Sequence, residues 1–169
     1  MKLTEFYLSQ LEDEGRRTRN AIEQVPDGKD DWKPHTKSMP FGRLAILVAG
    51  MPGWLAMQIE GEELDLNPPG GSGYRPPAMN TKAERLKAVD EGVAKARDAL
   101  KSTSDDHLMK PWRLKVAGKV VSEQPRYVVL RDTLAHMAHH RGQLTVYLRL
   151  CDATVPAIYG PSADENRFA

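Results

Sequence analysis

The stretch "LAHMAHHRGQLTVYLR", residues 134–149, holds three of the five histidines in a chain of 169 residues. On a helical wheel with about 100° per residue, this stretch and the residues just before it form two neighbouring stripes. The first stripe is apolar and consists of Leu130, Leu134, Met137, Leu144 and Leu148. The second consists of Val129, Thr133, His136, His140 and Tyr147. Together they predict a long helix whose wide inner face carries two histidines.

His136 and His140 are four residues apart, so a helix places both imidazoles on one side, within reach of a single metal ion. His139 falls on the polar side of the wheel, and Gln143 lies close to His136 at the edge of the inner face. The alternative to a metal site is a hydrogen-bonded polar spot in a bundle core. Because two inward imidazoles must lose water and find partners, the pair favours a functional role without deciding between these interpretations.

Arg141 lies in the middle of the apolar stripe, between Met137 and Leu144. A buried charge has to be paired or has to reach the surface. One interpretation is a structural ion pair, for which Glu14 on the inner face of the first helix is a candidate partner. The other interpretation places Arg141 in a pocket for an anionic substrate or at a subunit interface.

Three more segments show apolar residues at helical spacing: residues 3–25, 39–60 and 82–100, and we expect the last helix from about 123 to 151. The third segment begins with a capping-box pattern, Thr81 followed by Glu84. About twenty Pro- and Gly-rich residues precede it, enough for a crossover that lets the second and third helices run parallel. We therefore predict an all-α four-helix bundle, one domain over residues 1–169. A long crossover joins its second and third helices, and a short β-hairpin around Ala117-Gly118 precedes its last helix.

Composition excludes several classes of protein. The net charge of +1 lacks the basic excess with which nucleic-acid-binding proteins neutralise phosphates. The single cysteine, Cys151, cannot form an internal disulfide, and the first residues lack the apolar core of a signal peptide. The most apolar run, residues 44–57, is interrupted by Gly and Pro and is too short to span a bilayer. We expect a cytoplasmic protein that binds neither nucleic acid nor membranes.

The segment "HMAHHRGQLTVYLR", residues 136–149, resembles the last helix of the DinB-like proteins, a superfamily of metal-binding four-helix bundles. The resemblance extends to "DWKPHTKSMPFGRLA" at 31–45, "AGMPGWL" at 49–55 and "VPAIYGPSADE" at 155–165. Because separate segments match in the right order, the resemblance is quite specific for the fold. It is much less specific for an activity.

The resemblance implies one divalent metal, often nickel or zinc, held by three histidines. His136 and His140 match the two ligands of the last helix. The third family ligand lies in the second helix, and the matching position here is Leu47. Leucine cannot ligate a metal, and two imidazoles hold a divalent ion weakly with poorly fixed geometry. We therefore expect that any bound nickel or zinc is weakly held, with water or a buffer ligand completing its shell.

Some relatives use low-molecular-weight thiols, so the resemblance implies a metal-dependent enzyme of the thiol-transferase or hydrolase-like kind, with an incomplete histidine site. The alternative is a metal-free member that acts as a small-molecule-binding or stress-associated dimeric protein. In either case we expect a homodimer. The predicted pocket beside the histidines is formed by Leu47, Met51, Trp54, Arg141 and Gln143.

Overall fold

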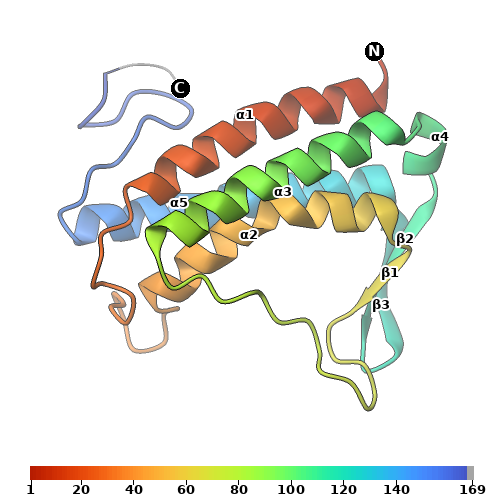
Figure 1. Ribbon diagram of the computed structural model, residues 1–169, viewed down its shortest axis with the longest axis horizontal. Coiled ribbons are helices and arrows are strands. Elements are labelled where there is room, and N and C mark those ends of the chain that lie inside the picture. The colour runs from red at the N-terminus through yellow and green to blue at the C-terminus, as the bar shows by residue number, and fades with distance from the viewer. Residues whose placement is uncertain (167–169) are drawn as a thin grey trace.

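Four long helices pack side by side in the computed structural model (Figure 1), which describes residues 1–166. They are α1 (Leu3–Glu23), α2 (Phe41–Glu60), α3 (Lys82–Ser102) and α5 (Arg126–Leu150), with one short helix, α4 (Asp105–Leu108), between α3 and the sheet. The predicted four-helix bundle is therefore confirmed. The last three residues of the predicted domain, 167–169, lie outside the described residues.

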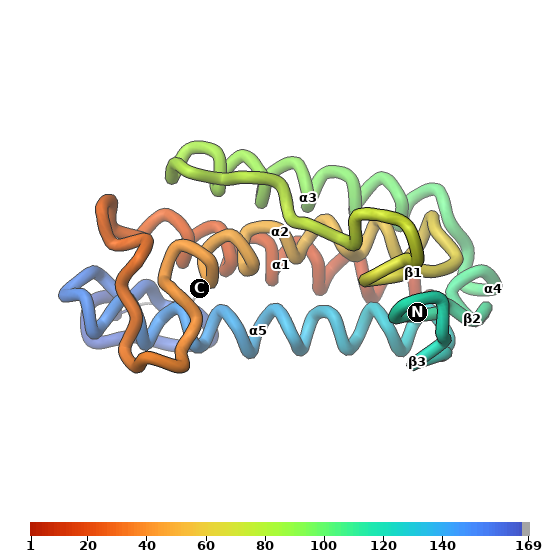
Figure 2. Tube along the Cα trace, turned by 90° about the horizontal axis from the view of Figure 1, so that it is seen from below, coloured from red at the N-terminus to blue at the C-terminus, as the bar shows by residue number. Residues whose placement is uncertain are grey.

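The long connection after α2 sets the direction of α3. It runs back along the bundle to the end where α2 begins, so that α3 is parallel to α2, whereas α1 and α5 run in the opposite direction (Figures 1 and 2). The predicted capping box opens α3: Thr81 Oγ1 accepts from the Glu84 N–H at 3.2 Å, and Glu84 Oε2 accepts from the Thr81 N–H at 2.9 Å. Both the crossover and the start of α3 are as predicted.

The parallel helices α2 and α3 approach closely at a pair of glycines. A Cβ added to Gly92 would lie 2.8 Å from the backbone nitrogen of Gly53, so the two backbones meet where neither helix has a side chain. Pro52 precedes Gly53, yet α2 continues through it to Glu60. The sequence suggested that Gly and Pro interrupt this apolar run, but the helix is continuous. By length and composition α2 could cross a membrane, but 61% of its most apolar window is buried inside the bundle, as in a core helix.

A small sheet covers one end of the bundle, between the crossover and the start of α5 (Figure 1). The predicted hairpin is present as β2 (Pro111–Val116) and β3 (Lys119–Pro125), joined by Ala117 and Gly118, which both have positive φ as a two-residue hairpin turn requires. The crossover adds β1 (Glu63–Asp65), which pairs with β2 in parallel. The predicted helical bundle with a short hairpin is thus confirmed, and β1 is an additional strand that is too short for a recognisable alternation.

Arg141 forms the polar centre of the bundle, and its side chain is 1% exposed. Its guanidinium donates to the carboxylate of Glu14 at 2.5 Å and to Thr18 Oγ1 at 3.0 Å. The hydroxyl of Tyr159, from the irregular segment after α5, contacts both Arg141 and Glu14. Glu14 and Thr18 lie on the inner face of α1 because they satisfy this one buried charge. The structural ion pair is thus the correct interpretation of Arg141.

Candidate functional site

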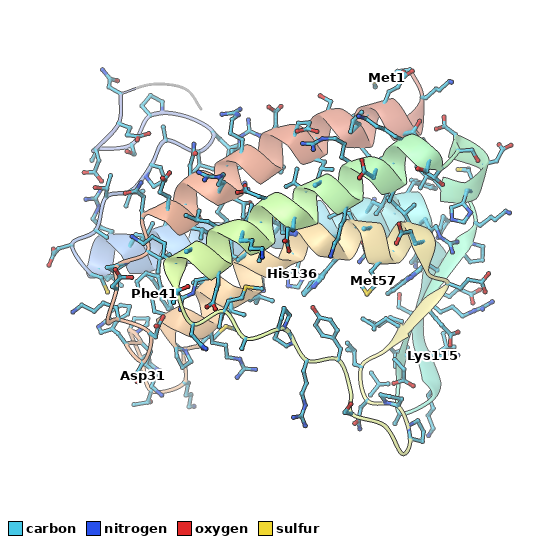
Figure 3. All side chains as sticks on the ribbon, in the orientation of Figure 1. Met1, Asp31, Phe41, Met57, Lys115 and His136 are labelled. Carbon is cyan, nitrogen blue, oxygen red and sulfur yellow. The ribbon has the colours of Figure 1, made fainter. Side chains whose placement is uncertain are left out.

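A cavity of about 530 Å³ lies between α2, α5 and the sheet. Each wall is one face of its element: the α2 residues recur at three and four positions, the α5 residues do likewise, and the strand residues alternate. From α2 come Arg43, Ile46, Leu47, Gly50, Trp54, Met57 and Gln58; from α5, Val129, Asp132, Thr133 and His136; from the sheet and its flank, Leu64, Leu66, Trp112, Leu114, Ser122 and Gln124. Most of this lining is apolar. Figure 3 marks Met57 and His136, which belong to two of these walls.

Two of the five predicted pocket residues, Leu47 and Trp54, line the cavity together with His136. The other three lie elsewhere. Met51 is fully buried in the bundle, and Arg141 is buried against α1. Gln143 is exposed and contacts histidines rather than the cavity. The wheel placed Arg141 and Gln143 on or near the inner face of the last helix, but that face is divided between the bundle core and the cavity.

His136 lies at the edge of the cavity with His140 beside it, and neither lies in the core as predicted. His136 is exposed at its side chain although its ring packs 6.0 Å from the ring of Trp54, and His140 is half-buried. Their Nε2 atoms are 2.8 Å apart. The pairing predicted from the i,i+4 spacing is therefore present. The pair is exposed because leucines and Arg141 occupy the core-facing stripe of α5. The neighbouring stripe, which carries His136 and His140, therefore lies at the open side of the bundle.

A chain of hydrogen bonds joins all three histidines. Gln143 Oε1 lies 2.8 Å from Nδ1 of His140, and Gln143 Nε2 lies 3.0 Å from Nε2 of His139. An amide oxygen only accepts, so we assign a proton to Nδ1 of His140, which leaves its Nε2 unprotonated. In this tautomer His136 donates from Nε2–H to Nε2 of His140. His139, expected to be separate on the polar side, is linked to the pair through Gln143.

The surroundings of His136 keep its ring neutral. Burial against the cavity wall lowers the pKa of His136 below the ordinary value of 6.5, and the neighbouring rings of His140 and His139 lower it further. A neutral imidazole can both donate and accept a hydrogen bond, whereas the imidazolium only donates. At neutral pH His136 is therefore a two-way hydrogen-bonding group at the cavity edge.

The residues present do not complete a metal centre. Two imidazole nitrogens bound to one tetrahedral zinc ion at about 2.0–2.1 Å each would lie about 3.3 Å apart. The 2.8 Å between Nε2 of His136 and Nε2 of His140 is a hydrogen-bond distance, shorter than that spacing. A third ligand is needed, and the family position is Leu47, an apolar part of the cavity wall. Within residues 1–166, no three His, Cys, Asp or Glu side chains converge on a point that could hold an ion.

The sheet and the crossover supply site residues that sequence reasoning missed. Tyr74, in the crossover, covers the cavity: its hydroxyl accepts from Nε1–H of Trp54 at 2.9 Å, and the two rings pack edge to face. Trp112 and Leu114 are in register with Gln124 and Ser122, which places these four side chains on the same face of the hairpin. That alternation was readable in the sequence, but nothing local says which face of the hairpin meets α2.

Comparison with known proteins agrees with this fold. A family model described as the DinB family matches residues 1–167. The chain belongs to the DinB family. Two solved structures have the same fold. A DinB-like protein from Bacillus cereus has a TM-score of 0.69 and 20% identity, and the match covers 92% of this chain and 97% of that one. The DinB-like protein YjoA of Bacillus subtilis has a TM-score of 0.67 and 16% identity, and the match covers 96% of this chain and 99% of that one.

One curated relative, the uncharacterized protein YrdA of Bacillus subtilis, is 39% identical over 67 residues. The matched segment covers 40% of this chain and 38% of that relative, so it spans well under half of either protein. Membership of the DinB family and the bundle fold are thereby established. The activity of this member has to be argued from its own cavity.

Proposed function

We propose that this DinB-family protein binds a largely apolar small molecule in the cavity between α2, α5 and the sheet, with His136 as the polar contact at its edge. The observation that carries the proposal is the cavity itself. Its volume of about 530 Å³ falls within the range of about 300–1,000 Å³ typical of small-molecule sites. Its apolar walls and few polar groups are also typical of such sites.

The histidine pair fits a binding or proton-transfer role without a resident metal. His136 reaches the cavity, His140 lies behind it at 2.8 Å, and Gln143 orients His140 through Nδ1. A ligand group that hydrogen-bonds His136 can exchange a proton with a neutral, oriented partner pair. The function supported best is therefore small-molecule binding, in which the histidines recognise the polar end of the ligand.

The test uses butylbenzene as an apolar probe, with binding measured by calorimetry and by NMR of the tryptophan indole N–H groups. We expect the signals of Trp54 and Trp112, which line the cavity, to shift on binding. The signal of Trp32, which packs on Phe41 and Tyr147 away from the cavity, should stay in place.

A matched pair of variants locates the binding. Leu47→Trp fills the cavity and should abolish the binding, whereas Val146→Trp, at an exposed position of α5 that does not line it, should leave the binding intact. Unchanged binding in Leu47→Trp, or no binding in the wild-type protein, would contradict the proposal.

A second candidate function is the metal-dependent thiol-transferase or hydrolase-like activity that the family resemblance implies. One observation favours it: Gln143 fixes the tautomer of His140 that a metal ligand needs, as outer-shell partners of metal-binding histidines do. This candidate requires a third donor from outside the chain. Metal analysis of protein purified without a nickel column, followed by thiol-transfer assays, separates it from the first, since a stoichiometric metal lost in His140→Ala would favour the enzyme.

Homodimerisation, a low-molecular-weight thiol as partner and a cytoplasmic location stay predictions of the sequence. Analytical ultracentrifugation at micromolar concentration would test the first of them directly.

A further inference from the structure

A buried hydrogen-bond donor in the cavity wall has no partner among residues 1–166. Trp112, on β2, lines the cavity and is only 5% exposed. Its Nε1–H is buried and makes no hydrogen bond within residues 1–166. Buried indole N–H groups usually have an acceptor, because leaving such a donor unsatisfied is unfavourable. Trp112, a residue of the cavity wall, therefore carries a donor for which the described chain supplies no acceptor.

The shape of the cavity limits what can supply that acceptor. Its wall on α2 extends from Arg43 to Gln58, which at 1.5 Å per residue corresponds to about 22 Å. Apolar side chains dominate this length, and His136 lies seven residues along α5 from Val129, the lining residue nearest the sheet. The cavity is thus long, apolar along its middle and provided with hydrogen-bonding groups at separate places.

Positive charge lies close to the end of the cavity that contains Trp112. The guanidinium of Arg126 is buried and donates to the carbonyl oxygens of Pro111 and Gly61, both at 2.8 Å. Pro111 immediately precedes Trp112 on β2. A fixed cation behind the wall favours a ligand atom with partial negative charge at this end.

We propose that the cavity binds an elongated, mostly apolar carbonyl compound, whose oxygen accepts a hydrogen bond from Nε1–H of Trp112. This inference rests on the proposed binding function and names its ligand class. A neutral carbonyl, as in a ketone, ester or amide, suits this end better than a carboxylate. The wall around Trp112 is mostly apolar, and a full charge would need several donors to offset its loss of water.

The test compares two probes that differ at a single position, butyrophenone and butylbenzene. We expect butyrophenone to bind the wild-type protein about two- to tenfold more tightly, as one additional neutral hydrogen bond allows. Both probes should move the indole N–H signal of Trp112, but butyrophenone should move it further downfield, because only its oxygen can accept the hydrogen bond. Trp112→Phe keeps an aromatic ring without the N–H, so the two probes should bind this variant equally. Trp32→Phe, away from the cavity, is the matched control and should keep the preference.

The possible results separate the two proposals. If neither probe binds, the proposed function fails and the ligand class fails with it. If both bind equally to the wild-type protein and the Trp112 signal moves alike with each, binding stands and the carbonyl inference is overturned. The wild-type NMR comparison decides the matter even if Trp112→Phe does not fold.

Discussion

Replacing Glu14 with glutamine tests the buried ion pair that holds α1 against α5. The substitution keeps the size of the side chain but leaves the guanidinium of Arg141, 1% exposed, without its carboxylate. Removing one partner of a buried pair typically costs about 3–5 kcal/mol, because the remaining charge is not compensated. We therefore expect Glu14→Gln to lower the free energy of unfolding by about 3–5 kcal/mol.

Replacing the other partner of the ion pair, Arg141, should cost less stability than replacing Glu14. In Arg141→Met the carboxylate of Glu14 keeps Arg17 at 2.7 Å and the hydroxyl of Tyr159 at 2.9 Å, and methionine fills much of the vacated volume. We expect a loss of about 1–3 kcal/mol. In this background Glu14→Gln should cost less than about 1 kcal/mol, which gives a coupling energy of at least about 2 kcal/mol.

The assay is urea unfolding at pH 7, followed by far-UV circular dichroism, with the slope against urea checked for constancy. Asp13→Asn is the matched control. Asp13 is next to Glu14 on α1, and its carboxylate pairs with Arg16, three positions further along. Both of these side chains are about half exposed, so the loss of this pair should cost less than about 1 kcal/mol. A cost below about 1 kcal/mol for Glu14→Gln, or simple additivity of the two substitutions, would refute the reasoning.

Three further predictions concern the site and the helix contact. The pKa of His136 is lower in the folded protein than in the unfolded chain, so the unfolded state binds the proton more readily and the stability that His136 contributes falls as the pH drops below about 6.5. The melting temperature of His136→Gln should therefore fall less between pH 8 and pH 5 than that of the wild-type protein. An equal fall in both proteins would contradict this. Gly92→Ala should lower the free energy of unfolding, because overpacking typically costs about 1–3 kcal/mol, which exceeds the gain in helix propensity. Gly142→Ala should instead raise it by up to about 1 kcal/mol, because the added Cβ meets no neighbouring atom within 4 Å. Chemical denaturation measures both changes. Leu47→His should supply the missing third ligand and tighten Zn²⁺ binding by at least about tenfold in calorimetry, and His140→Ala in the same background should abolish the gain.

Local periodicity determined most of the fold. The apolar stripes predicted the four long helices, Thr81 and Glu84 predicted the start of α3, and Ala117-Gly118 predicted the hairpin turn. The i,i+4 spacing also predicted that His136 and His140 meet. These features depend on residues close together in the chain, so their physical causes can be read directly from the sequence.

Tertiary structure alone decided how each inner face is divided between core and cavity. The wheel could not say that Arg141 faces Glu14 of α1 while His136 faces Trp54 of α2, because both contacts are with partners more than fifty residues away. The parallel strand β1 likewise depends on the crossover, which brings residues 63–65 beside β2, about fifty residues later in the chain. The sequence determined which residues share a face, and long-range packing determined what each face meets.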